Sequence, residues 1–192
     1  MTRRAAGLEP GGWDKSALVD VSNVFDVLAP EWHTRTSPQR TEVVVDALRR
    51  GLEEVGEQGD LAFEIGAGIG TYSALLSHSY RTVLSVDLSW EMIVRAPDGP
   101  AHRIVADASA LPVQSDTADG VFLINAFVFP EEVSRVLKDG GVIVWVNSSG
   151  DQTPIHLSTD DLVKALPFPV RGVESTAGAG SWCVLVRDDR LS

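Results

Sequence analysis

The most informative segment of this sequence is Phe63-Glu64-Ile65-Gly66-Ala67-Gly68-Ile69-Gly70-Thr71. The apolar run 61–63 at its start is too short for a helix and indicates a buried strand. The three glycines that follow can adopt positive φ and let the backbone come close to a bound ligand. A helix that begins near Thr71 would direct free N–H groups at the same space. Strand, glycine turn and helix together predict a crevice of the nucleotide-binding type.

Apolar strands alternate with helical patterns after this turn. Strands are expected at about 60–65, 81–87, 103–107, 120–125 and 142–146, with helices at about 70–79, 89–95 and 130–138. Strands that are apolar on both faces and separated by helices form a parallel sheet covered on both sides. One or two helical turns at 160–166 and a hairpin at 171–176 and 181–187 follow. The sequence therefore predicts an α/β fold: a doubly wound, mostly parallel seven-stranded sheet with an antiparallel C-terminal hairpin and an N-terminal helical extension.

The N-terminal extension is predicted to contain two helices. Residues 13–29 carry apolar side chains at i, i+3, i+4 and i+7 spacing, and a proline ends the pattern. A second helical pattern covers 41–52. We expect residues 1–12 to form a flexible tail, residues 13–59 to form a lid and residues 60–192 to form a Rossmann-like domain, all within one compact unit.

The chain of 192 residues has a net charge of −11, which limits its partners. An acidic surface repels phosphate backbones and anionic lipids, so a broad nucleic-acid or membrane surface is not expected. The longest apolar run, 121–129, is too short to span a bilayer, and no apolar signal segment follows the first residues, so we expect a cytoplasmic protein. Cys183 alone cannot form a disulfide or a thiolate metal site, and no metal is expected.

The spacing of the glycines distinguishes two classes of ligand. A dinucleotide-binding turn has the pattern G-x-G-x-x-G, but this chain has Thr71 where the third glycine is required and its own third glycine at Gly70. Glu64, two residues before the first glycine, would also repel a pyrophosphate. A nicotinamide-dependent oxidoreductase is therefore only a minor alternative.

The segment from Glu64 to Gly70 resembles the first motif, E/D-x-G-x-G-x-G, of class I S-adenosylmethionine-dependent methyltransferases. Later segments follow the order of that family. Val86-Asp87-Leu88 resembles the end of its second strand and Ala106-Asp107-Ala108 the end of its third. The segments 119–125 and 135–143 resemble the fourth strand and the turn before the fifth. Any one of these motifs is weak, but five in order are specific.

The resemblance, which spans about residues 60–148, implies S-adenosyl-L-methionine as the cofactor and assigns its binding residues. In the family, the acid after the second strand accepts both ribose hydroxyls, and Asp87 has the two acceptor oxygens for this role. The acid after the third strand, here Asp107, accepts the adenine amino group, and the next backbone N–H, here that of Ala108, reaches a ring nitrogen. The implied cofactor-binding residues are Glu64, Gly66, Ala67, Gly68, Gly70, Asp87, Leu88, Asp107, Ala108 and Asn125.

Each of the three acids also has a purely structural interpretation. Asp87 can cap the helix that starts near Ser89, and Asp107 can be a solvated loop acid. Glu64 can pair with Arg81. The sequence leaves these alternatives open.

Methyl transfer from a sulfonium is an in-line displacement, so the protein mainly aligns the nucleophile with the methyl group in a dry site. A base is needed only when the nucleophile arrives protonated, and the candidates are His33 and His156. Asn125-Ala126-Phe127 lacks both prolines of the N-P-P-Y/F sequence of amide- and nucleobase-methylating relatives, so that activity is not supported. Phe127 and Phe129 can instead form an apolar wall.

We expect a methyltransferase that acts on an oxygen or nitrogen nucleophile of a small or medium organic acceptor. No large insertion follows the fifth strand, so residues 13–50 or another subunit must complete the substrate side. A shallow site suits either a peptide or carrier-bound acceptor or a homo-oligomer. The alternative is a catalytically inactive relative that binds the cofactor and serves as a partner or scaffold subunit.

Overall fold

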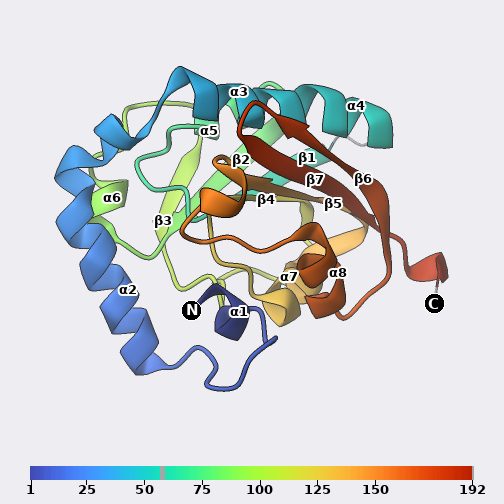
Figure 1. Cartoon of the computed structure of the whole chain (residues 1–192), viewed down its shortest axis with the longest axis horizontal. Helices are drawn as coiled ribbons and strands as arrows, with labels where there is room; N and C mark the ends of the chain where they lie inside the picture. The colour runs from blue at the N-terminus through green and yellow to red at the C-terminus, as the bar shows by residue number, and fades with distance from the viewer. Residues whose placement is uncertain (57–58, 192) are drawn as a thin grey trace.

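The computed structural model describes residues 1–56 and 59–191, and these contain one sheet of seven strands (Figure 1). The strands are β1 Gly59–Ile65, β2 Tyr80–Asp87, β3 His102–Val105, β4 Ala118–Ile124, β5 Leu137–Asn147, β6 Val170–Ala177 and β7 Gly180–Arg187. Their order in the sheet is β3-β2-β1-β4-β5-β7-β6. Strands β1 to β5 run parallel, and β7 runs antiparallel to both of its neighbours. The predicted mostly parallel seven-stranded sheet with a C-terminal hairpin is confirmed.

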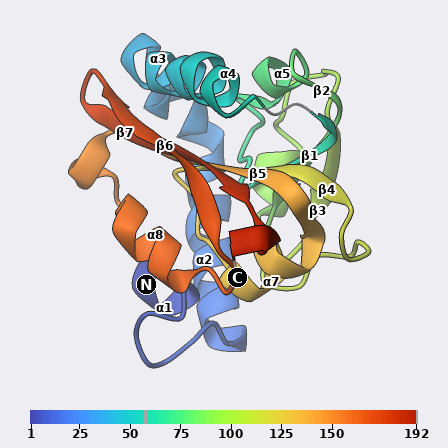
Figure 2. The same ribbon diagram turned by 90° about the vertical axis from the view of Figure 1, so that its right-hand side faces the viewer.

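Helices cover both faces of the sheet (Figure 2). The α-helices are α1 Thr2–Ala5, α2 Lys15–Leu28, α3 Pro38–Asp46, α4 Leu52–Val55, α5 Ser73–Leu76, α6 Trp90–Ile93, α7 Pro130–Val136 and α8 Thr159–Ala165. A 3-10 segment, η1 Ala29–Arg35, joins α2 to α3, and a π-helical segment, η2 Ala47–Gly51, joins α3 to α4. None of the helices in the described part of the chain is long and apolar enough to cross a membrane.

The sheet separates two hydrophobic cores because side chains alternate along its strands. Along β5, Val144 and Val146 belong to the core beneath α3 and α4, whereas Ile143 and Trp145 belong to the core on the other face. Figure 2 shows α3, α4 and α5 on one side of the sheet and α1, α7 and α8 on the other. Both faces of the central strands are therefore buried, as the continuous apolar runs in the sequence predict.

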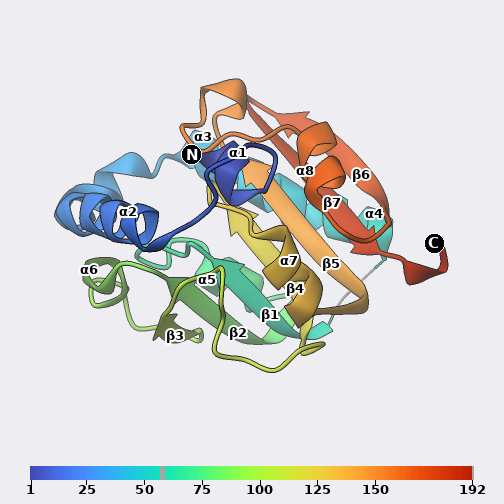
Figure 3. The ribbon, with the colours of Figure 1, turned by 90° about the horizontal axis from the view of Figure 1, so that it is seen from below.

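The two long N-terminal helices start at side-chain caps. The Asp14 carboxylate accepts a bond from the Ala17 N–H at 2.9 Å at the start of α2. The Ser37 hydroxyl accepts one from the Arg40 N–H at 3.3 Å, so the second helix begins at Pro38, earlier than the apolar pattern predicts. Figure 3 shows α2 at one end of the sheet beside α6, where it borders the carboxyl ends of the strands.

The structure differs from the sequence-based expectations in two places. Residues 2–5 form α1 rather than part of a loose tail, because Ala5 and Ala6 are buried and Arg3 forms an ion pair with Asp161 of α8. The helix expected at 70–79 is only the single turn α5, Ser73–Leu76. Tight turns on both sides of it leave little chain between the glycine segment and β2.

Candidate active site

A cavity of about 380 Å³ lies at the carboxyl ends of the central strands, where the strand order reverses around β1. Open parallel sheets bind ligands at this edge, and a cavity of this size accommodates a small organic molecule. Residues of α2, η1 and α3 close the outer side. Of the residues predicted to bind the cofactor, those that line the cavity are Glu64, Gly66, Ala67, Gly68, Asp87, Leu88, Asp107, Ala108 and Asn125, whereas Gly70 lies outside the lining.

The glycine turn after β1 forms one wall of the cavity. Gly66 and Gly68 have φ of 67° and 57°, in the left-handed region that favours glycine. A Cβ atom at Gly66 would lie 2.8 Å from the Cβ of Ala126, and one at Gly68 would lie 3.1 Å from the indole nitrogen of Trp32. Glycine at these two positions therefore allows the loop after β4 and segment η1 to approach the turn closely.

The Asp87 carboxylate ties the end of β2 to the glycine turn. One oxygen accepts a bond from the Gly68 N–H at 2.7 Å, and the other accepts one from the Ser89 N–H at 2.8 Å. Burial raises the pKa of Asp87, and these two backbone donors partly offset that effect. The cap of α6 is Ser89, not Asp87, because the Ser89 hydroxyl accepts the bond from the Met92 N–H at 3.1 Å. Each Asp87 oxygen keeps acceptor capacity for a ligand hydroxyl.

The Glu64 carboxylate is buried beneath the glycine turn. It accepts hydrogen bonds from the Ser73 hydroxyl and, at 2.8 Å, from the Ser85 hydroxyl. Burial raises the pKa of Glu64 to about 7, although the two hydroxyl donors act in the opposite direction. The pairing of Glu64 with Arg81 is not found, since Arg81 instead lies 3.2 Å from an oxygen of Asp60. Glu64 is therefore an acid that a cation in the cavity would help to ionise.

Asp107 is partly exposed and accepts hydrogen bonds from two neighbouring groups. The indole N–H of Trp13 lies 3.1 Å from one carboxylate oxygen and 3.3 Å from the other. The Ser109 N–H donates to the first oxygen at 2.8 Å. The Trp13 ring in turn contacts Phe127 and Phe129, with centroid distances of 5.6 and 5.0 Å. One tryptophan thus joins the acid after β3 to the aromatic loop after β4.

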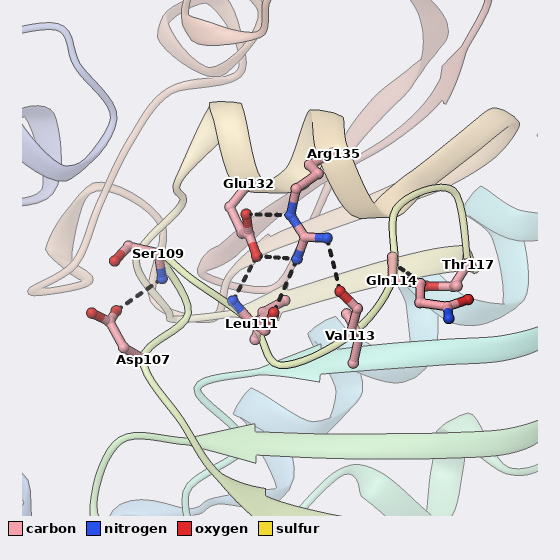
Figure 4. A network of polar contacts seen from close by, with 8 residues as sticks. All are labelled: Asp107, Ser109, Leu111, Val113, Gln114, Thr117, Glu132 and Arg135. Carbon is pink, nitrogen blue, oxygen red and sulfur yellow. Dashed lines mark hydrogen bonds and ion pairs between the residues drawn. The ribbon is translucent and has the colours of Figure 1, made fainter.

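The loop after β3 is fixed by helix α7 (Figure 4). The Glu132 carboxylate accepts a bond from the Leu111 N–H at 2.6 Å. The Arg135 guanidinium donates to the carbonyls of Leu111 and Val113 at 3.0 and 2.8 Å, and it also binds Glu132. This network satisfies backbone groups that would otherwise be free, so it restrains the loop that carries Asp107.

Asn125 connects the ends of β4 and β5. Its backbone has φ of 52°, a conformation that asparagine adopts more readily than most residues. Its side-chain NH₂ donates to the Ser148 hydroxyl at 2.9 Å, and its side-chain oxygen accepts a bond from the Ser148 N–H at 2.8 Å. The amide is thus engaged within the protein, on the cavity wall.

Neither predicted base lies in the cavity lining. His33 is exposed on η1, where the neighbouring Trp32 is the residue that faces the glycine turn. His156 has a ring nitrogen 3.3 Å from a carboxylate oxygen of the exposed Asp151. The structure brings neither histidine to the acids at the strand ends.

Several cavity residues were missed by sequence reasoning: Trp13, Trp32, Arg35, Arg40 and Tyr72. All except Tyr72 belong to the N-terminal segment, where the sequence indicates helices but not which side chains face inward. Trp13 and Trp32, which lie at the start of the 13–29 helical pattern and just beyond its end, were the available signal, since tryptophan is highly buried on average.

Comparison with known proteins shows which proteins this chain resembles. Residues 63–145 match the family model described as "Methyltransferase domain". The chain is 35% identical to a demethylmenaquinone methyltransferase of Clavibacter sepedonicus, over 93% of this chain and 76% of that protein. It is 28% identical to a malonyl-[acyl-carrier protein] O-methyltransferase of a Marinomonas species, over 50% of this chain and 41% of that protein. The solved DhpI complex with S-adenosylhomocysteine has a similar fold, with a TM-score of 0.68 at 17% identity over 91% of this chain and 99% of that chain.

The chain belongs to the class I S-adenosylmethionine-dependent methyltransferases. S-adenosylmethionine is accordingly its cofactor. The residues present fit such a group: a turn of glycines that a Cβ would obstruct, and carboxylates that can accept hydroxyl and amino donors or face a cation. When bound, this cofactor supplies an electrophilic methyl group on a sulfonium.

The raised pKa of Glu64 makes stability depend on pH. A carboxyl whose pKa is higher in the folded state than its usual value of about 4.3 binds a proton on folding, so stability falls as pH rises from about 4.3 to the folded value. With a folded pKa of about 7, wild type should lose on the order of 3 kcal/mol relative to Glu64→Gln across this window. Urea unfolding of both proteins from pH 4.5 to 8 measures the difference, and a constant gap across this range would contradict the assignment.

Asp87→Ala should weaken the binding of S-adenosylhomocysteine by at least about 1.5 kcal/mol, because the variant removes charge-assisted acceptors. Isothermal titration calorimetry measures this loss. Asp98→Ala is a suitable control, since Asp98 is an exposed acid outside the cavity lining. Equal affinity of the two variants, with circular dichroism showing both folded, would remove Asp87 from the cofactor site.

Proposed function

We propose that this methyltransferase acts on an oxygen of a planar, hydroxylated aromatic acceptor of small or medium size. The observation that supports this most directly is the aromatic wall formed by Trp13, Phe127 and Phe129 beside the acid after β3. An apolar wall of aromatic side chains favours an inserted ring over a flexible polar chain. The ten residues predicted to bind the cofactor, Gly70 included, keep that role as part of the proposal.

The composition of the cavity favours an acceptor that ionises without a histidine or lysine base. Neither residue type occurs among the residues found to line the cavity. A phenol or hydroquinone hydroxyl is more acidic than that of an alcohol, with a pKa of about 10, so a small fraction is ionised near neutral pH and its proton can pass to water. The acceptor oxygen then forms a bond to the methyl carbon as the bond between that carbon and sulfur breaks. The electron pair of the broken bond stays on sulfur, and S-adenosylhomocysteine is released.

The Clavibacter relative also points to acceptors of this type, since its name denotes a quinone precursor. Such rings offer two nucleophilic positions, the hydroxyl oxygen and an adjacent ring carbon. Oxygen is our proposal, and ring carbon and nitrogen are tested beside it. We also propose that a second copy of the chain completes the substrate side of the cavity.

A second candidate acceptor is a carrier-bound carboxylate. Two arginines, Arg35 and Arg40, line the cavity, and within the described residues neither forms an ion pair with a carboxylate. An ionised carboxylate needs no base and pairs well with guanidinium groups. The Marinomonas relative is named for a malonyl carrier substrate, which is of this chemical class.

Transfer of a radiolabelled methyl group tests the proposal. The acceptors are 1,4-naphthohydroquinone, benzylamine and a malonyl thioester, and mass spectrometry locates the methyl group in each product. We expect transfer to the hydroquinone oxygen. Transfer to a ring carbon of the hydroquinone, to the amine or to the thioester instead would overturn the proposal. Binding of S-adenosylhomocysteine without transfer to any acceptor would favour an inactive partner subunit, and native mass spectrometry of the same sample reports subunit number.

Phe127→Ala provides a matched test of the aromatic wall. This variant should lower kcat/KM for the hydroquinone about tenfold, because it removes an aromatic contact and apolar area. Affinity for S-adenosylhomocysteine should fall by less than this, because Phe129 still contacts the Trp13 ring that binds Asp107. A parallel loss of both would show that Phe127 supports the fold of the loop and not the acceptor.

A further inference from the structure

Two hydrogen-bond links join the N-terminal segment, residues 13–50, to the acids at the ends of β2 and β3. We infer that Trp13 and Asp26 are positioning residues of the cofactor site, Trp13 acting directly on Asp107 and Asp26 acting through Ser89 on Asp87. This inference rests on the proposed placement of adenine at Asp107 and of ribose at Asp87.

The first link is the contact between Trp13 and Asp107. An indole N–H can only donate, and it lies 3.1 and 3.3 Å from the two oxygens of one carboxylate. The Ser109 N–H adds a third contact at 2.8 Å. The indole itself is held by Phe127 and Phe129. The carboxylate is therefore fixed in orientation and keeps a lone pair for a further donor, such as an amino group on a purine ring.

The second link passes through Ser89, which is fully buried. The Ser89 hydroxyl donates to a carboxylate oxygen of Asp26 on α2, and the same oxygen accepts a bond from the Glu91 N–H at 3.3 Å. The backbone N–H of Ser89 donates to Asp87 at 2.8 Å. Asp26 thus fixes the start of α6, and the start of α6 fixes one oxygen of Asp87.

Both links are made by the N-terminal segment when it lies over the cavity. The same conformation therefore closes the outer side and orients both acids before a ligand arrives. Carboxylates that are already oriented lose less rotational freedom on binding, and this raises affinity. The segment is thereby part of the cofactor site, in addition to being a cover for the acceptor.

Trp13→Phe tests the first link, because it keeps an aromatic ring and removes the donor. The measurement is the ratio of dissociation constants for S-inosylhomocysteine, which has an oxo group in place of the adenine amino group, and S-adenosylhomocysteine. We expect wild type to favour the adenosyl ligand and Trp13→Phe to reduce this preference about threefold to tenfold, the effect of one hydrogen bond. Trp90→Phe is the control, since Trp90 is 61% exposed.

Asp26→Ala tests the second link with a ligand pair that differs at the ribose, S-adenosylhomocysteine and its 2′-deoxy analogue. The variant should reduce the preference for the ribose ligand by about threefold to tenfold. Asp26→Asn should restore most of it, because the amide oxygen can still accept the bond from Ser89. Asp20→Ala, which removes an exposed acid from the same helix, should behave as wild type.

The ligand ratios separate a positioning role from a general loss of folding. If each variant weakens both members of its ligand pair equally, the inference is wrong, while the placement of the cofactor stands. If wild type itself shows no preference within either pair, the placement of adenine and ribose is wrong, and the inference falls with it. Thermal unfolding of every variant shows which samples are folded during the titrations.

Discussion

The bond from the Gly68 N–H to the Asp87 carboxylate is the contact on which the site depends. The donor and acceptor atoms are 2.7 Å apart. The bond joins the turn after β1 to the end of β2, and these two strands are parallel neighbours in the sheet. The positive φ of Gly68 directs its N–H toward the carboxylate, and the buried position of Asp87 strengthens the bond by excluding water. The rest of the cavity is assembled around this pair of loops. Trp32 packs against the glycine turn from the outer side of the cavity. The Ser89 N–H donates to Asp87, and the Ser89 hydroxyl donates to Asp26 of helix α2.

The buried acids of the site are carboxyl groups that a cationic ligand would help to ionise. Glu64 lies beneath the turn with only hydroxyl donors, and its pKa rises to about 7. Asp87 is also buried, and the nearby charge of Asp26 adds to the rise of its pKa that burial causes. These acids destabilise the protein when ionised and without a partner. On the proposed placement of the cofactor, its sulfonium and ammonium groups bring positive charge near these acids, and this offsets the free-energy cost of ionising them.

The central part of the fold could be predicted from sequence because its determinants are local. Apolar runs, the glycine turn and the acids at strand ends all lie within a few residues of the structure they specify, and the sheet follows from them. The roles of Trp13 and Asp26 could not be predicted in the same way, since Trp13 meets Asp107 across 94 residues of chain and Asp26 meets Ser89 across 63. The two histidines failed to reach the cavity for a related reason. Proximity to a strand end in sequence does not fix the direction of a side chain, and at His33 the neighbouring Trp32 occupies the inward position.

The division between predictable and unpredictable parts also follows the bounds of the family model. The family model covers residues 63–145, which include the glycine turn and the acids after β2 and β3. Trp13, Arg35 and Arg40 line the same cavity from outside that range. On the proposed assignments, the N-terminal segment therefore contributes both to the orientation of Asp107 and to the walls that an acceptor meets. The N-terminal segment contributes Trp13 and two arginines to the cavity, and the loop after β4 contributes the other two members of the aromatic wall, Phe127 and Phe129.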